Sequence, residues 1–107
     1  MTIPEVTVDE LAEAIAGGAV VIDVREVEEY TEAHVPGALL FPLSGLADAV
    51  DSVPLASPLY VICRSGARSM RACQFLAGTN RSAVNVAGGT LAWLGSGRPV
   101  ATGLDPA

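Results

Sequence analysis

LYVICRSGARSMRACQFLAG, residues 59–78, is the stretch that decides the fold. Its first five residues, LYVIC, form an apolar run that predicts a buried strand ending at Cys63. Its second half, MRACQFLAG, places Met70, Cys73 and the pair Phe75 and Leu76 at the spacing of one apolar helix face. Cys63 therefore lies where a strand has ended and a helix has not yet begun.

The chain on both sides of this stretch repeats the alternation of strand and helix. Apolar runs at 20–24 (VVIDV), 39–41 (LLF) and 83–86 (AVNV) predict further buried strands. Helices are expected over 7–17, where Thr7 and Glu10 form a capping box, over 25–33, 44–50 and 90–97. We expect a single α/β domain over residues 1–107, built on a largely parallel sheet.

Composition and charge exclude several classes of function. Half of the residues are apolar, and twelve acidic residues outnumber six arginines, with no lysine, for a net charge of −6. This balance argues against a nucleic acid or an anionic membrane as partner. The first residues do not resemble a secretory signal, and no stretch is apolar for about 18 residues. We therefore expect a cytoplasmic protein whose two cysteines are free thiols.

The loop CRSGARS, residues 63–69, has the residues needed to hold a negative charge on Cys63. Gly66 permits a tight curl in which the backbone N–H groups from Ser65 to Ser69 converge on the sulfur. The start of the following helix and two arginines, Arg64 and Arg68, favour the thiolate further. The alternative is an inert buried thiol at a strand end, which is common for cysteine.

Three segments, in order, resemble the rhodanese superfamily. DVREVEEYTEAHVPGALLFPL at 23–43 is similar to its amino-terminal signature, CRSGARS at 63–69 to its active-site loop, and GGTLAWLGSGRPV at 88–100 to its carboxyl-terminal signature. The resemblance implies a rhodanese-like fold with a five-stranded, largely parallel sheet flanked by helices. It also implies a sulfurtransferase that moves sulfane sulfur through a persulfide on Cys63. We expect no cofactor.

The expected partners are an anionic sulfur donor such as thiosulfate and an acceptor, which is a thiol, cyanide or a sulfur-carrier protein. The substrate-binding residues are expected to be those that follow the nucleophile: Arg64, Ser65, Gly66, Ala67, Arg68 and Ser69. Arg64 is expected to contact the anion. Arg68 has two alternative roles: it contacts the substrate, or it anchors the loop by pairing with an acid beneath it.

Two other functions are compatible with the same fold. A small phosphatase or arsenate reductase resembles the family but has a loop one residue longer than the six residues from Cys63 to Arg68, and a histidine where Ile62 stands. A non-enzymatic docking or regulatory module often lacks the loop cysteine, which this chain keeps.

The other conspicuous residues are expected to be structural. The spacing of Arg25 and Glu29 permits an ion pair on a short helix. His34 is expected to brace a turn, Trp93 to pack in or beside the core, and Cys73 to face the sheet from the helix after the loop. One histidine and two separated cysteines do not form a recognisable metal site.

Overall fold

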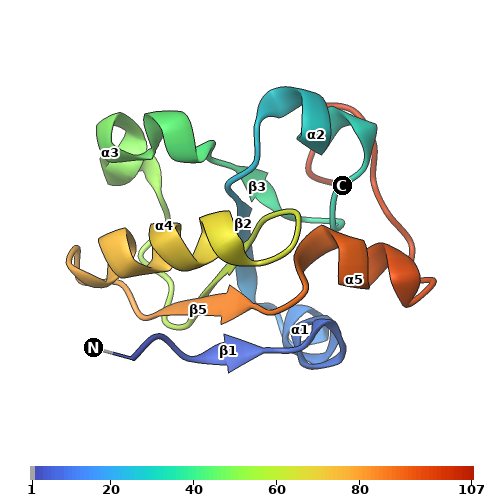
Figure 1. Cartoon of the computed structure of the whole chain (residues 1–107), viewed down its shortest axis with the longest axis horizontal. Helices are drawn as coiled ribbons and strands as arrows, with labels where there is room; N and C mark the ends of the chain where they lie inside the picture. The colour runs from blue at the N-terminus through green and yellow to red at the C-terminus, as the bar shows by residue number, and fades with distance from the viewer. Residues whose placement is uncertain (1) are drawn as a thin grey trace.

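The computed structural model describes residues 2–107 as five strands alternating with five α-helices (Figure 1). In chain order they are β1 (Glu5–Val6), α1 (Val8–Ala16), β2 (Val20–Asp23), α2 (Val27–Glu32), β3 (Leu39–Leu40), α3 (Leu46–Ala49), β4 (Leu59–Ile62), α4 (Ala67–Ala77), β5 (Ala83–Val86) and α5 (Gly89–Gly95). Short 3₁₀ turns flank α3 at Leu43–Gly45 and Val50–Ser52. The predicted α/β class and most of the predicted elements are confirmed.

The sheet has the order β1-β5-β4-β2-β3, and every neighbouring pair is parallel. β4 lies at the centre, and its final residue, Ile62, is in register with Asp23 at the end of β2. Since parallel strands all point the same way, the loops that follow β2, β4 and β5 meet at one edge of the sheet. This arrangement brings Cys63 next to segments that are far from it in the sequence.

Helices cover both faces of the sheet, and each face has its own apolar core. On one face α3 and α4 pack through Leu46, Ala72, Cys73 and Leu76. On the other face α1 and α5 pack through Val8, Leu11 and Trp93. Alternate residues of β4 enter the two cores, with Leu59 and Val61 in the first and Ile62 in the second. Both faces of the central strand are therefore buried, as its continuous apolar run requires.

The first helix illustrates how local sequence sets an element. The Thr7 hydroxyl accepts a hydrogen bond from the Glu10 amide at 3.2 Å, and the Glu10 carboxylate accepts one from the Thr7 amide at 2.9 Å. This is the predicted capping box, and it starts α1 with two otherwise unpaired amides satisfied. β1, which precedes it, is only two residues long and was not predicted as a strand from its residues.

The C-terminal tail folds back beside α2 (Figure 1). Ala101 and His34 exchange backbone hydrogen bonds at 2.9 Å, and the Gly103 amide donates to the Thr31 carbonyl at 2.8 Å. The buried His34 ring stacks on Tyr30 and faces the carbonyl oxygens of Asp105 and Pro106 at 3.0 and 3.1 Å. His34 thus has a structural role, as predicted, and its ring joins α2 to the tail.

Two predictions about side chains are wrong. Phe75 was expected on the apolar face of its helix, but it is 40% exposed, and the buried residues of α4 are Ser69, Ala72, Cys73 and Leu76. Arg25 was expected to pair with Glu29 along a helix, but α2 begins only at Val27. Arg25 instead folds back onto buried Asp23, with Nη2 2.8 Å from Oδ2, and donates to the Ala33 carbonyl at 2.8 Å.

Candidate active site

The loop between β4 and α4 curls around the sulfur of Cys63. Gly66 has a φ of 115°, which side-chain-bearing residues rarely adopt, and it lies immediately before α4. This conformation lets the Gly66 amide point back and donate to Cys63 Sγ at 3.1 Å. The Ser69 hydroxyl, from the first turn of α4, lies 3.2 Å from the same sulfur. The amide of Ser65 also donates to Cys63, so three of the predicted loop residues place donors on it, and Ala67 and Arg68 lie in the same turn.

The loop makes Cys63 a better acid than an ordinary thiol. Burial alone raises the pKa of Cys63, because only 1% of the residue is exposed. Hydrogen bonds from the Ser69 hydroxyl and from the amides of Ser69, Gly66 and Ser65 act in the opposite direction. Together they outweigh burial, so the pKa of Cys63 lies below its ordinary value. A thiolate is both the nucleophilic form of cysteine and the form that this loop stabilises.

The first turn of α5 fixes the backbone of Cys63 from the other side. The Thr90 amide and hydroxyl both donate to the Cys63 carbonyl, at 2.9 and 3.0 Å, and the Leu91 amide donates to the Arg64 carbonyl at 3.1 Å. Gly89 lies so close that a Cβ there would be 2.6 Å from both carbonyl oxygens. The second glycine of the Gly-Gly pair therefore serves a close approach to the loop, a role that sequence reasoning did not assign.

Arg68 anchors the loop to α2. Its two terminal nitrogens donate to the two carboxylate oxygens of Glu29 at 2.7 and 2.8 Å. Of the two readings of Arg68, this geometry favours the anchor that pairs with an acid. The hydrogen bond from Arg68 lowers the pKa of Glu29 to about 2, with smaller effects from the Glu26 amide and from Arg25. The acid that sequence reasoning assigned to Arg25 thus holds the active-site loop.

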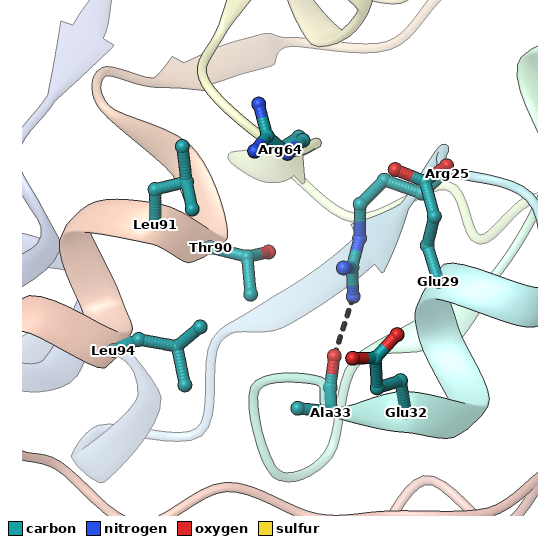
Figure 2. Close-up of a pocket in the computed structure, with 8 residues that line it drawn as sticks. All are labelled: Arg25, Glu29, Glu32, Ala33, Arg64, Thr90, Leu91 and Leu94. Carbon is teal, nitrogen blue, oxygen red and sulfur yellow. Dashed lines mark hydrogen bonds between the residues drawn. The ribbon is translucent and has the colours of Figure 1, made fainter.

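Arg64 lies beside a cavity of about 240 Å³ between α2 and α5. The cavity is lined by Arg25, Glu29, Glu32, Ala33, Arg64, Thr90, Leu91 and Leu94. Figure 2 shows the two leucines on one side of it and the two glutamates on the other, with Arg64 at one end. Arg64 is exposed and forms no ion pair with any residue of the described part, 2–107. Its guanidinium is thus free to meet an anion.

Cys73 lies in the same apolar core as Cys63, on the sheet-facing side of α4. Both thiols are free and buried. Burial raises the pKa of Cys73 to about 12, and the nearby charges of Cys63 and Glu5 act in the same direction. The thiol thus stays protonated at neutral pH. The prediction that Cys73 faces the sheet is confirmed.

Over 2–107, no group of three or more His, Cys, Asp or Glu side chains is arranged to hold a metal ion. Within the same range, no helix is both long enough and apolar enough to cross a membrane.

Comparisons with known proteins find matches to the sequence and the fold of this chain. The sequence model of the family named rhodanese-like domain matches residues 7–96. YtwF of Bacillus subtilis, whose name proposes it as a sulfurtransferase, is 35% identical over 92% of this chain and 98% of its own. The thiosulfate sulfurtransferase GlpE of Pseudomonas entomophila is 34% identical over 73% and 72% of the two chains. A crystal structure of a rhodanese-related protein from Thermoplasma volcanium superposes with a TM-score of 0.85 at 29% identity, covering 95% of this chain and 99% of that one.

Proposed function

Because the chain belongs to the family of rhodanese-like domains, we propose that it is a sulfurtransferase that carries sulfur as a persulfide on Cys63. Relatives named as sulfurtransferases support the general activity. The observation that carries the persulfide mechanism is the ring of hydrogen-bond donors around Cys63 Sγ, formed by the Ser69 hydroxyl and backbone amides of the loop. These donors favour negative charge on Cys63 Sγ, which Sγ carries as the attacking thiolate and again when the persulfide gives up its outer sulfur.

In the first half-reaction, the Cys63 thiolate attacks the outer sulfur of thiosulfate. A Cys63–sulfur bond forms as the sulfur–sulfur bond of thiosulfate breaks, and sulfite leaves with the bonding electron pair. The product is the persulfide anion, whose charge is on the terminal sulfur. The hydrogen bonds of the loop lower the pKa of Cys63 and so increase the fraction of thiolate available for this step.

In the second half-reaction, an acceptor thiolate or cyanide attacks the terminal sulfur of the persulfide. The bond between the two sulfurs breaks, and Cys63 leaves as a thiolate, so its charge returns to the site of the hydrogen-bond donors. The acceptor becomes a persulfide or thiocyanate. A thiol of a sulfur-carrier protein can take the same position as a small thiol. Two half-reactions through one covalent intermediate give ping-pong kinetics.

We assign binding of the anionic sulfur donor to Arg64. Its exposed guanidinium lies at the end of the cavity and is not neutralised by a carboxylate of the described chain. Arg68 is a weaker candidate because Glu29 occupies its two terminal nitrogens. The two predicted roles are thus divided, with Arg64 attracting the donor and Arg68 positioning the loop.

Transfer from thiosulfate to cyanide, followed as thiocyanate, tests the activity, and Arg64→Ala tests the assignment. Removing this cation leaves the amides of the loop in place, so we expect KM for thiosulfate to rise about tenfold, with a smaller fall in kcat. Arg71→Ala, at an exposed arginine of α4, is the matched control and should leave KM unchanged. Absence of thiocyanate from the folded wild type would refute the activity. An unchanged KM in Arg64→Ala would refute only the role of Arg64.

A further inference from the structure

Asn85 is a polar side chain inside the sheet that the proposed reaction does not use. It lies in β5, all of whose residues are buried, and it is 1% exposed. A buried amide in a central strand is costly unless each of its polar atoms has a partner. Its hydrogen bonds run from β1 on one side to the active-site loop on the other. Asn85 therefore connects the edge of the sheet to the cysteine loop.

The orientation of the Asn85 amide is fixed by two acceptors. Nδ2 lies 2.8 Å from Oε2 of Glu5, on neighbouring β1, and 3.2 Å from the carbonyl oxygen of Gly66. A carboxylate and a backbone carbonyl can only accept hydrogen bonds, so both require the NH₂ group of the amide. The oxygen Oδ1 must then point the other way. It faces the Ser69 hydroxyl at 2.5 Å.

The Ser69 hydroxyl has one hydrogen and three acceptors within reach. These are Asn85 Oδ1 at 2.5 Å, Cys63 Sγ at 3.2 Å and the Gly66 carbonyl at 3.2 Å. The Gly66 carbonyl already accepts from the Met70 amide at 3.1 Å and from Asn85 Nδ2, which occupies both of its lone pairs. The hydrogen of Ser69 therefore has two places to go, the amide oxygen of Asn85 or the sulfur of Cys63.

We propose that Asn85 is a positioning residue that holds the Ser69 hydrogen while Cys63 Sγ is uncharged and releases it to the sulfur when charge arrives there. The inference rests on the proposed function, in which Sγ is charged as the free thiolate and carries no charge in the persulfide. Rotation of one hydroxyl then follows the charge through both half-reactions. Glu5 and the Gly66 carbonyl act through Asn85, by keeping its oxygen turned toward Ser69.

Removing the acceptor has a distinctive consequence. In the wild type, Ser69 can donate to the thiolate only by leaving the buried Oδ1 of Asn85 unpaired, which costs free energy. In the variant without Oδ1 this cost is absent, and Ser69 donates to Sγ in every state. The thiolate becomes more stable and forms at lower pH. A more stable thiolate is also a weaker nucleophile, because nucleophilicity falls as basicity falls. Reactivity should therefore rise at acid pH and fall at alkaline pH.

The experiment measures alkylation of Cys63 by iodoacetamide against pH in wild type and in Asn85→Val, which keeps a strand-forming residue. Peptide mass mapping separates modification of Cys63 from that of Cys73. Below the pH at which Cys63 ionises, we expect alkylation of the variant to be roughly two- to threefold faster, because about fivefold more thiolate, the effect of about one hydrogen bond, is partly offset by a nucleophilicity about twofold lower. On the alkaline plateau it should be roughly twofold slower. If Asn85→Val does not keep the circular dichroism spectrum of the wild type, Asn85→Ala removes the same acceptor.

Ser69→Ala supplies the control for the route of the effect. If Asn85 acts through Ser69, the substitution at Asn85 should change nothing further in a Ser69→Ala background. Unshifted profiles in a folded Asn85 variant would overturn the proposal, and so would a shift that persists without the Ser69 hydroxyl. Alkylation needs no sulfur donor, so these results are independent of whether the protein transfers sulfur from thiosulfate.

Discussion

The two cysteines of this chain share one apolar core and have opposite properties. Both are free, and both are almost completely buried, at 1% exposure for Cys63 and 0% for Cys73. Burial raises the pKa of each thiol. Only Cys63 is surrounded by a hydroxyl and backbone amides that lower its pKa again. Burial therefore does not decide whether a thiol is reactive; the hydrogen-bond donors around the sulfur decide it.

The difference arises from where each cysteine lies along the backbone. Cys73 is inside α4, where neighbouring amides are used by the helix itself. Cys63 precedes the helix, in a loop whose amides have no helical partner and are turned inward by Gly66. Each prediction below alters the surroundings of one cysteine and asks whether the other is affected.

The largest effect is expected from Gly89→Ala, which disturbs the backbone of Cys63. A Cβ at Gly89 would lie 2.6 Å from the carbonyl oxygens of Cys63 and Arg64, so the loop must move. We expect a loss of about 2 kcal/mol or more in the free energy of unfolding, and loss of most sulfur transfer. Gly95→Ala, at a glycine of the same helix whose Cβ would meet open space, should change stability by less than about 1 kcal/mol. Equal behaviour of the two variants in urea unfolding would contradict the close approach.

A smaller effect is expected from Cys73→Ala, which trims a buried side chain of the core without touching the loop. We expect about 1 kcal/mol of lost stability and unchanged sulfur transfer. Cys63→Ser should instead keep the fold and lose transfer altogether. A marked loss of activity in Cys73→Ala would show that the two thiols act together. It would contradict the claim that only Cys63 is reactive.

The smallest effect is expected from Glu29→Gln, which weakens the anchor of the Cys63 loop. The pKa of Glu29 is lowered from 4.5 to about 2, so its ion pair with Arg68 stabilises the fold fully above pH 4.5 and is lost as the pH falls through about 2. Both side chains are about a third exposed, so the gain at neutral pH is about 1 kcal/mol or less. Urea unfolding should show wild type and variant converging between pH 4.5 and 2. A constant difference across this range would exclude the ion pair as its cause.

Local patterns in the sequence predicted the features that depend on near neighbours. The capping box of Thr7 and Glu10, the strand that ends just before Cys63 and the curl at Gly66 are all encoded within a few residues. The wrong pairing of Arg25 came from assuming that a helix already existed there, whereas α2 starts two residues later. Phe75 was misplaced because hydrophobicity alone does not say which side of a helix faces solvent.

Long-range contacts of the site left no trace in the local pattern. Glu5 and Asn85 are 80 positions apart, and they meet only because β1 and β5 pair at one edge of the sheet. Glu29 and Arg68 are 39 positions apart, and their contact depends on how α2 lies against the loop. The predicted buried strand AVNV did indicate one such contact, since an asparagine in a buried strand requires partners for its amide.

Peptide mass mapping after treatment with thiosulfate tests the central claim most directly. Both cysteines are free and buried, so neither is prevented by a disulfide from carrying sulfur. Only the groups around each sulfur distinguish the two. We predict that one sulfur atom, a gain of about 32 Da, appears on the peptide that contains Cys63 and that cyanide removes it. The peptide that contains Cys73 should remain unmodified. Added sulfur on Cys73, or none on Cys63 in folded protein, would contradict the assignment of Cys63 as the sulfur carrier.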